Sequence, residues 1–185
     1  MNDSAPPRGT LVLVVGPSGA GKDTLLNLAK ENLAGDEHFR FVRRVITRPA
    51  GGGENSGFAT EETFQRLVED GLLALHWQAH GLSYGLPIIV DEWLANGDVV
   101  VANGSRAILP EARRRFSRLT IVNVVAPPDL IAGRLRTRGR EAADDIGRRL
   151  KRGEEIEVDG ADVVTIDNSG PPHAAAEQLV RLIRS

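Results

Sequence analysis

The chain has 185 residues, with 23 Lys and Arg against 25 Asp and Glu, which suits one α/β domain with a proper core. A net charge of −2 leaves no global basic field for nucleic acid, and the lack of cysteine excludes disulfides, thiolate metal sites and cysteine nucleophiles. The N-terminus has no signal-peptide pattern, and no apolar run approaches the roughly 18 residues of a membrane span. We therefore predict a cytoplasmic protein, flexible over residues 1–9, with no nucleic-acid or membrane partner.

A glycine-rich turn follows the first predicted strand, at residues 11–15, whose five aliphatic residues suit a strand buried on both faces of a parallel sheet. Gly16 to Lys22 matches the Walker A spacing GxxxxGK, in which backbone N–H groups and a helix N-terminus surround a phosphate chain. The motif predicts ATP as a ligand, with Lys22 reaching the β- and γ-phosphates. The predicted nucleotide-binding residues of this P-loop are Gly16, Pro17, Ser18, Gly19, Ala20, Gly21, Lys22, Asp23 and Thr24.

One position departs from Walker A, which has Ser or Thr after the lysine, whereas this chain has Asp23. A carboxylate beside a triphosphate would repel it unless Mg²⁺ lies between them, so we predict Asp23 as a direct or water-mediated metal ligand. The alternative is that Asp23 only interacts with the helix dipole, because it lies in the first turn of the next helix.

Strands and helices are expected to alternate, which predicts an α/β P-loop fold with three layers and a central parallel sheet. Helices are expected at residues 24–33, 60–70 (capped by Thr60), 87–95, 108–116 and 174–184, with one more starting at 127–129. Strands are expected at residues 11–15, 39–46, 98–102, 119–125 and 163–166, and residues 72–85 are predicted as a strand followed by a turn.

Two regions that do not belong to the alternating strands and helices of the core are predicted to close over substrates. Residues 48–86 are expected to be an insertion that binds the acceptor. Residues 134–157 are expected to form a lid, since 134–152 holds eight basic and three acidic residues. The alternative for individual arginines is a solvated helix face with i,i+4 ion pairs. The whole chain, 1–185, is predicted to be a single kinase domain.

Several motifs resemble those of guanylate kinase-like P-loop kinases: GPSGAGKDT from Gly16, ITRP from Ile46, the 53–54 GE pair, a tryptophan strand ending in YG at Tyr84, and RLRTRGRE from Arg134. Guanylate kinases have a base-reading glutamate before that tryptophan, but this chain has His76, which cannot accept two hydrogen bonds as a carboxylate does. The acidic residues after the third strand are also missing. With these departures, the chain resembles the ribose 1,5-bisphosphate phosphokinases.

The resemblance implies transfer of the γ-phosphoryl group of ATP, with Mg²⁺, to the 1-phosphate of ribose 1,5-bisphosphate, giving 5-phosphoribosyl 1-diphosphate and ADP in phosphonate degradation. The acceptor phosphate is already ionised near pH 7, so no general base is needed. Lys22, Arg48, Arg138 and Arg149 are the implied catalytic residues, and Arg140 is a further implied nucleotide contact. Asn168 is expected to contact adenine because of its position in the loop before the last helix. The implied substrate-binding residues are Arg48, Glu54, His76, Tyr84, Asn103, Ser105 and Arg106.

Alternatives stay open at this point. For Glu54, Tyr84 and Arg106, a purely structural role explains the residue as well as substrate binding does, and for His76 it does so almost as well. The alternative functions for the chain are a guanylate or other nucleoside monophosphate kinase, or a guanylate kinase-like binding scaffold without catalysis. The oligomeric state is expected to be a monomer or homodimer.

Overall fold

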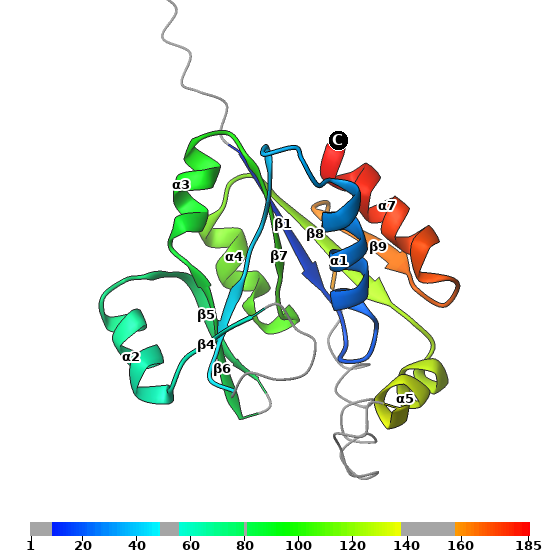
Figure 1. Ribbon diagram of the computed structural model, residues 1–185, viewed down its shortest axis with the longest axis horizontal. Helices are drawn as coiled ribbons and strands as arrows, with labels where there is room; N and C mark the ends of the chain where they lie inside the picture. The colour runs from blue at the N-terminus through cyan, green and yellow to red at the C-terminus, as the bar shows by residue number, and fades with distance from the viewer. Residues whose placement is uncertain (1–8, 49–55, 80, 138–157) are drawn as a thin grey trace, which may run out of the picture. The chain divides into compact units, whose positions relative to one another are not determined.

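The computed structural model describes residues 9–48, 56–79, 81–137 and 158–185. The elements in chain order are β1 (Thr10–Val15), α1 (Lys22–Asn32), β2 (Phe39–Phe41), β3 (Arg44–Ile46), β4 (Ser56–Phe58), α2 (Glu61–Glu69), β5 (Leu73–Ala79), β6 (Leu82–Pro87), α3 (Ile89–Ala95), β7 (Val99–Asn103), the 3₁₀ turn η1 (Arg106–Ile108), α4 (Leu109–Arg115), β8 (Leu119–Val125), α5 (Pro128–Thr137), β9 (Val163–Asp167) and α7 (Pro172–Arg184), most of which are labelled in Figure 1.

The strands form a five-stranded sheet of order β2-β7-β1-β8-β9 and a four-stranded sheet of order β4-β3-β6-β5. In the first sheet, β2 pairs with β7 and β8 pairs with β9, both in parallel, as the alternation of strands and helices predicts. No helix within the described ranges is long and apolar enough to cross a membrane.

The chain divides into two compact units. The first lies within Met1–Leu13 and Gly35–Leu119, and the second within Val14–Ala34 and Thr120–Ser185. The four-stranded sheet belongs to the first unit, whereas the P-loop, α1, β9, α5 and α7 belong to the second. The prediction of one kinase domain with an acceptor-binding insertion and a lid stays a prediction.

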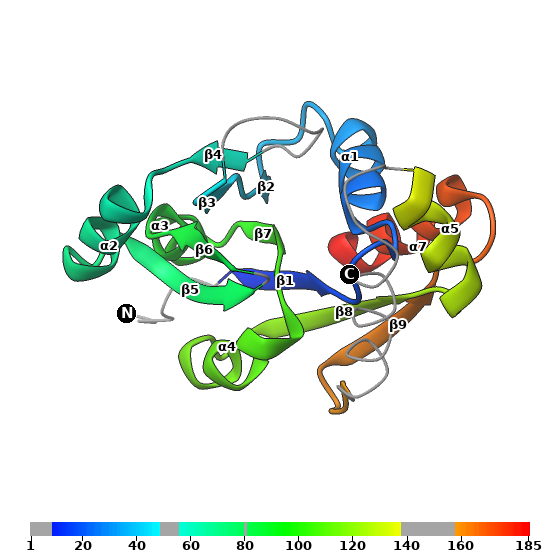
Figure 2. The ribbon, with the colours of Figure 1, turned by 90° about the horizontal axis from the view of Figure 1, so that it is seen from below.

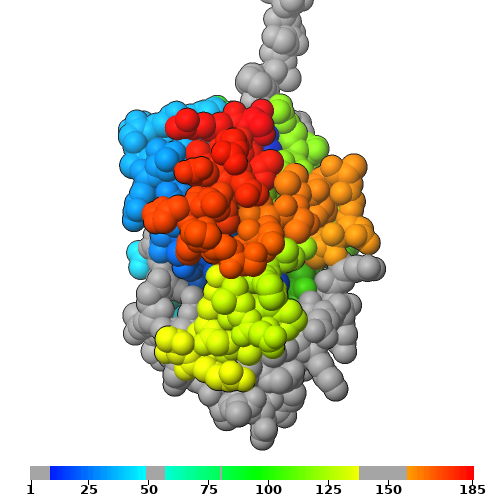
Figure 3. All heavy atoms as spheres, turned by 90° about the vertical axis from the view of Figure 1, so that its right-hand side faces the viewer, coloured from blue at the N-terminus to red at the C-terminus, as the bar shows by residue number. Residues whose placement is uncertain are grey.

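The second unit is built on α1 and α7, which lie side by side in Figures 1 and 3. On α1 the buried residues Leu25 and Ala29 are four positions apart, which places them on one face of the helix. The buried residues of α7 follow the same helical spacing: Ala175, Ala176, Leu179, Val180 and Ile183. Burial of a leucine of this kind contributes about 1.5–3 kcal/mol, so this pair of helices supplies a substantial part of the unit's core.

The expected strand at 39–46 is wrong as a single element. Residues Phe39–Phe41 pair with β7 in the five-stranded sheet, whereas Arg44–Ile46 pair with β4 and β6 in the other sheet. The Val42 N–H donates to the Val101 carbonyl at 2.8 Å, and the chain leaves the first sheet after this bond. A local pattern of alternating apolar residues carries no signal for such a change of partner strand.

The 72–85 segment is a strand with a second strand after it, not a strand followed only by a turn. β5 and β6 form an antiparallel hairpin with Gly81 at φ 72° between them, a backbone conformation that favours glycine. Pro87 ends β6 where a helix start was expected, and α3 begins two residues later. The LSYGLP sequence of β6 contains glycine and proline, which are depleted in strands, and this explains why the strand was missed.

The helix α2 begins where its sequence predicts. Thr60 is its N-cap, and the Thr63 N–H donates to the Thr60 hydroxyl at 3.1 Å. Phe64 of α2 is 2% exposed and packs with Ala59 and Leu73, so α2 covers the start of β5 (Figure 2). The remaining helices differ from expectation mainly at their ends. α7 begins at Pro172 instead of Ala174 because proline is accepted in the first turn of a helix.

Candidate active site

The P-loop has the backbone conformations that its glycines predict. Gly16, Gly19 and Gly21 have φ values of 140°, 85° and 97°, which residues with a side chain rarely adopt. At Gly16 a Cβ atom would also lie 2.2 Å from the Val124 carbonyl oxygen, so the backbone of β8 leaves no room for a side chain. Glycine is therefore required here both for conformation and for the close approach of β8.

Lys22 is the first residue of α1, and its ammonium group turns back over the P-loop. It donates hydrogen bonds to the carbonyl oxygens of Gly16 and Pro17, both at 2.9 Å. This arrangement holds a positive charge against the turn that precedes the helix N-terminus, where an anion is also favoured by the helix dipole. The predicted P-loop residues thus form a turn, Gly16 to Gly21, that leads directly into the first residues of α1.

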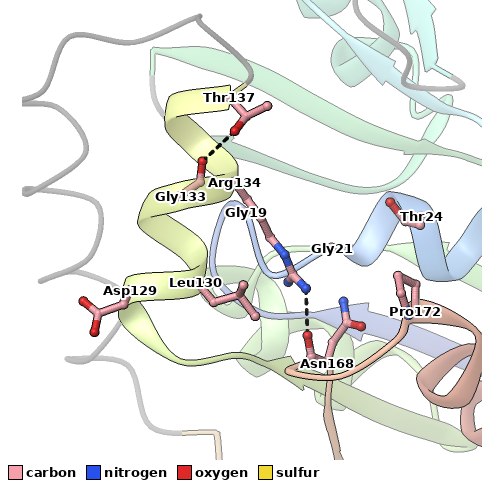
Figure 4. Close-up of a pocket in the computed structure, with 10 residues that line it drawn as sticks. All are labelled: Gly19, Gly21, Thr24, Asp129, Leu130, Gly133, Arg134, Thr137, Asn168 and Pro172. Atoms are coloured by element: carbon pink, nitrogen blue, oxygen red, sulfur yellow. Dashed lines mark hydrogen bonds between the residues drawn. The ribbon is translucent and has the colours of Figure 1, made fainter.

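A second group of donors contacts the P-loop from outside. Asn168 is 2% exposed, and its side-chain Nδ2 donates to the Ala20 carbonyl at 2.7 Å. The Arg134 guanidinium donates to the same carbonyl at 3.2 Å. It also donates to the Asn168 carbonyl at 2.9 Å, a bond drawn in Figure 4. Asn168 was predicted as a nucleotide contact. Arg134 was missed, although it is the first arginine of the RLRTRGRE segment.

These residues border a pocket of about 490 Å³, within the usual size range of small-molecule sites. Figure 4 shows that the pocket lies between the P-loop, α5 and the segment between β9 and α7. Its lining residues are Gly19, Gly21, Thr24, Asp129, Leu130, Gly133, Arg134, Thr137, Asn168 and Pro172. The pocket adjoins the P-loop, so a ligand whose phosphates occupied the turn would find space for its remaining part here.

Asp23 is the second residue of α1 and half-buried. The parts of the chain that the structure describes contain no group of three or more His, Asp or Glu residues that could hold a metal ion. Mg²⁺ does not need such a group, because it commonly binds to one or two carboxylates together with phosphate oxygens and water. A single carboxylate at the start of α1, next to the P-loop, fits this requirement, and the metal role of Asp23 stays a prediction.

The first unit contains a stack of three side chains on the β3–β6–β5 sheet. The Trp77 and Tyr84 rings are stacked with centroids 5.6 Å apart and planes within 6°. The Arg44 guanidinium lies over the Tyr84 ring, 5.4 Å from its centroid, within the range of a cation–π contact. Arg44 was not among the predicted site residues, although it lies two residues before the ITRP motif.

The strand register separates two residues that were predicted to line one acceptor site. Tyr84 is opposite Trp77, and directly opposed residues of an antiparallel pair lie on the same face. His76, next to Trp77 in the chain, is opposite Gly85 and therefore lies on the other face. The structure thus does not bring His76 and Tyr84 together.

Arg48 follows β3 and is half-buried. The residue before it is held tightly, because the Thr47 N–H donates to the Ser83 carbonyl at 3.1 Å and the Ser83 N–H donates to the Thr47 hydroxyl at 2.9 Å. The buried Ser83 hydroxyl donates in turn to the Glu61 carboxylate at 3.2 Å. These bonds fix the backbone from which the Arg48 side chain extends.

The predicted residues at and after the end of β7 are consecutive or nearly so in the chain. Asn103 is buried at the end of the strand, and the Ser105 hydroxyl accepts from the Ala107 N–H at 3.3 Å, which caps the η1 turn. Arg106 begins η1, and burial lowers the pKa of its guanidinium below the usual value, although arginine remains charged at neutral pH. A bound phosphate would offset the cost of this burial.

Four predicted residues lie outside the described residues: Glu54, Arg138, Arg140 and Arg149. Their roles stay predictions, as does closure of the 134–157 lid and of the 48–86 insertion.

Comparison with known proteins identifies relatives that match nearly the whole chain, although no protein-family model matches it. The chain is 48% identical over 175 residues to the ribose 1,5-bisphosphate phosphokinase of Agrobacterium fabrum, covering 94% of this chain and 96% of that protein. It is 46% identical over 176 residues to the enzyme of the same name from Thiobacillus denitrificans, covering 95% and 93%.

A solved structure confirms the predicted fold class. The crystal structure of guanylate kinase from Anaplasma phagocytophilum matches with a TM-score of 0.69, covering 96% of this chain and 86% of that one. At 18% sequence identity the likeness shows the fold alone, an α/β P-loop architecture with a central parallel sheet.

Proposed function

The chain belongs to the ribose 1,5-bisphosphate phosphokinase family, and from this premise we propose that it phosphorylates the 1-phosphate of ribose 1,5-bisphosphate with ATP. The products are 5-phosphoribosyl 1-diphosphate and ADP. The observation that carries the proposal is 48% identity to a named relative over nearly the whole of both chains. We further propose that the enzyme acts in phosphonate degradation in the cytoplasm, as a monomer or homodimer.

The reaction forms a bond between an oxygen of the 1-phosphate and the γ-phosphorus of ATP. The bond from that phosphorus to the β–γ bridging oxygen breaks, and ADP leaves with the electron pair. The attacking phosphate oxygen is already ionised near pH 7, because the second pKa of a phosphate is about 6. The protein is therefore not required to remove a proton, and its task is to align two anions and compensate their charge.

The P-loop is the proposed donor site. Its amides and the Lys22 ammonium would bind the β- and γ-phosphates of ATP, while the adjoining pocket would hold the nucleoside. Mg²⁺, when bound, would neutralise phosphate charge, with Asp23 holding it directly or through water. Arg138, Arg140 and Arg149 are proposed to stabilise the transferring phosphoryl group and the nucleotide from the lid.

On the acceptor side, Arg48 is proposed to hold one phosphate and Arg106 the other, because a bisphosphate requires two anchored ends. Tyr84 is proposed to contact the acceptor from the face that also bears the Arg44 guanidinium. Glu54, Asn103 and Ser105 complete the set of proposed acceptor contacts, whereas His76, on the opposite face of the hairpin from Tyr84, is not included. The second candidate, guanylate kinase, shares the fold. It is less favoured because His76 occupies the position of the base-reading glutamate.

A coupled ATP-turnover assay with ribose 1,5-bisphosphate or GMP as acceptor, combined with phosphorus NMR of the products, tests the proposal. We expect turnover and new diphosphate signals with the ribose compound only. Turnover of GMP alone would contradict the proposed acceptor, whereas the P-loop kinase fold would stand. If neither compound is phosphorylated although ATP binds tightly, the acceptor is a different small phosphorylated compound.

A further inference from the structure

Asn168 lies at the point where β9 ends, and its backbone and side chain are both held in place. Its N–H donates to the Val125 carbonyl at 2.8 Å, which ties this position to the end of β8. Its side-chain amide reaches the P-loop, where Nδ2 donates to the Ala20 carbonyl at 2.7 Å. The reversed amide would place Oδ1 against that carbonyl oxygen, and two acceptors cannot bond, so chemistry fixes the orientation of the side chain.

The Ala20 carbonyl is held from two directions. Arg134 Nη1 donates to it at 3.2 Å, while Nη2 of the same guanidinium donates to the Asn168 carbonyl at 2.9 Å. Asn168 is thus both a donor to the P-loop and an anchor for the second donor. The contact is also close, because a Cβ atom on Gly21 would lie 2.3 Å from Asn168 Nδ2.

A carbonyl fixed on one side of a peptide fixes the N–H on the other. The peptide bond is planar, and the described residues contain no cis peptide, so the Gly21 N–H points opposite to the Ala20 carbonyl. With that carbonyl turned toward Asn168, the Gly21 N–H is directed away from Asn168. This amide belongs to the GxxxxGK turn, whose N–H groups are the donors to a bound phosphate chain.

We infer that Asn168 is a positioning residue for phosphoryl transfer, which orients the Ala20–Gly21 peptide so that its amide donates to the phosphates of the nucleotide. The inference rests on the proposed function in taking ATP as the ligand. It differs from a direct contact of Asn168 with the base. That contact would use Oδ1, which is buried without a hydrogen-bond partner among the residues described.

The two roles have different consequences for binding. A residue that orients the P-loop contributes to the affinity for any ligand with a phosphate chain and nothing to that for a bare nucleoside. A residue that contacts the base contributes equally to ATP and to adenosine. Calorimetric titration with Mg·ATP, inorganic tripolyphosphate and adenosine therefore separates them.

The variant is Asn168→Ala, and its matched control is Asn27→Ala, which removes an exposed asparagine from α1. We expect Asn168→Ala to weaken binding of Mg·ATP and tripolyphosphate about three- to tenfold, as for one lost hydrogen bond, with adenosine affinity unchanged. Asn168→Asp should weaken phosphate binding further, because it faces the Ala20 carbonyl with a second acceptor. Asn27→Ala should bind all three ligands as the wild type does.

Steady-state kinetics give an independent readout. The KM for ATP should rise in Asn168→Ala while the KM for ribose 1,5-bisphosphate stays constant. Equal losses of ATP and adenosine affinity, or no loss for ATP, would overturn the inference. If Asn168→Ala does not fold, Asn168→Ser replaces it in the same titrations. Turnover of GMP in place of the ribose compound would contradict the proposed acceptor. The comparison of nucleotide binding by the wild type and the Asn168 variants would still test the inference.

Discussion

At the scale of single residues, Lys22 carries the charge on which the donor site depends. Its ammonium donates to the carbonyl oxygens of Gly16 and Pro17, each at 2.9 Å, and the residue is half-exposed. We expect Lys22→Ala to lower kcat/KM at least about 10²-fold, in the range of other lost transition-state donors, and to leave the fold intact. Steady-state assays measure kcat/KM, and thermal unfolding measures the stability of the fold.

Lys30→Ala, at the exposed end of α1, is the matched control. Unchanged turnover in Lys22→Ala would show that the P-loop is not the donor site.

At the scale of elements, the alternation of β5 and β6 decides which side chains can share an acceptor. His76 and Tyr84 lie on opposite faces, and Tyr84 shares its face with the Arg44 guanidinium. We expect Tyr84→Ala to raise the KM for ribose 1,5-bisphosphate about tenfold or more, as loss of an anchored aromatic contact would, and His76→Ala to change it less than about twofold. Acceptor titrations at saturating ATP measure both. The reverse ranking would place the acceptor on the His76 face and argue against a role for Tyr84.

The same elements show which features could be predicted from the sequence. β1, the P-loop and the Thr60 cap depend on local composition, and the structure confirms them. The change of sheet between β2 and β3 depends on distant partner strands, and no local pattern indicates it. Arg134 was missed for a similar reason. Its role is set by contact with Ala20, which lies 114 positions away in the chain.

At the scale of the whole molecule, a ligand that binds only the folded state raises its stability. With ADP at about 100 times its Kd, linkage predicts about 2.7 kcal/mol, and a chain of this length gains about 2–4 °C in Tm per kcal/mol. We therefore expect Tm to rise by about 5–11 °C in differential scanning fluorimetry. Lys22→Ala should show a smaller rise at the same ADP concentration. An equal rise in both proteins would mean that ADP binds away from the P-loop.

The bond from Asn168 to the Ala20 carbonyl also has a consequence for the order of synthesis. A ribosome makes Ala20 of the P-loop 148 positions before Asn168. Until Asn168 emerges, the glycine-rich turn lacks the side chain that we infer to orient its peptide. On this inference, the nascent protein would gain full affinity for nucleotide only after β9 has been added beside β8, so ATP would stabilise the fold only after that step.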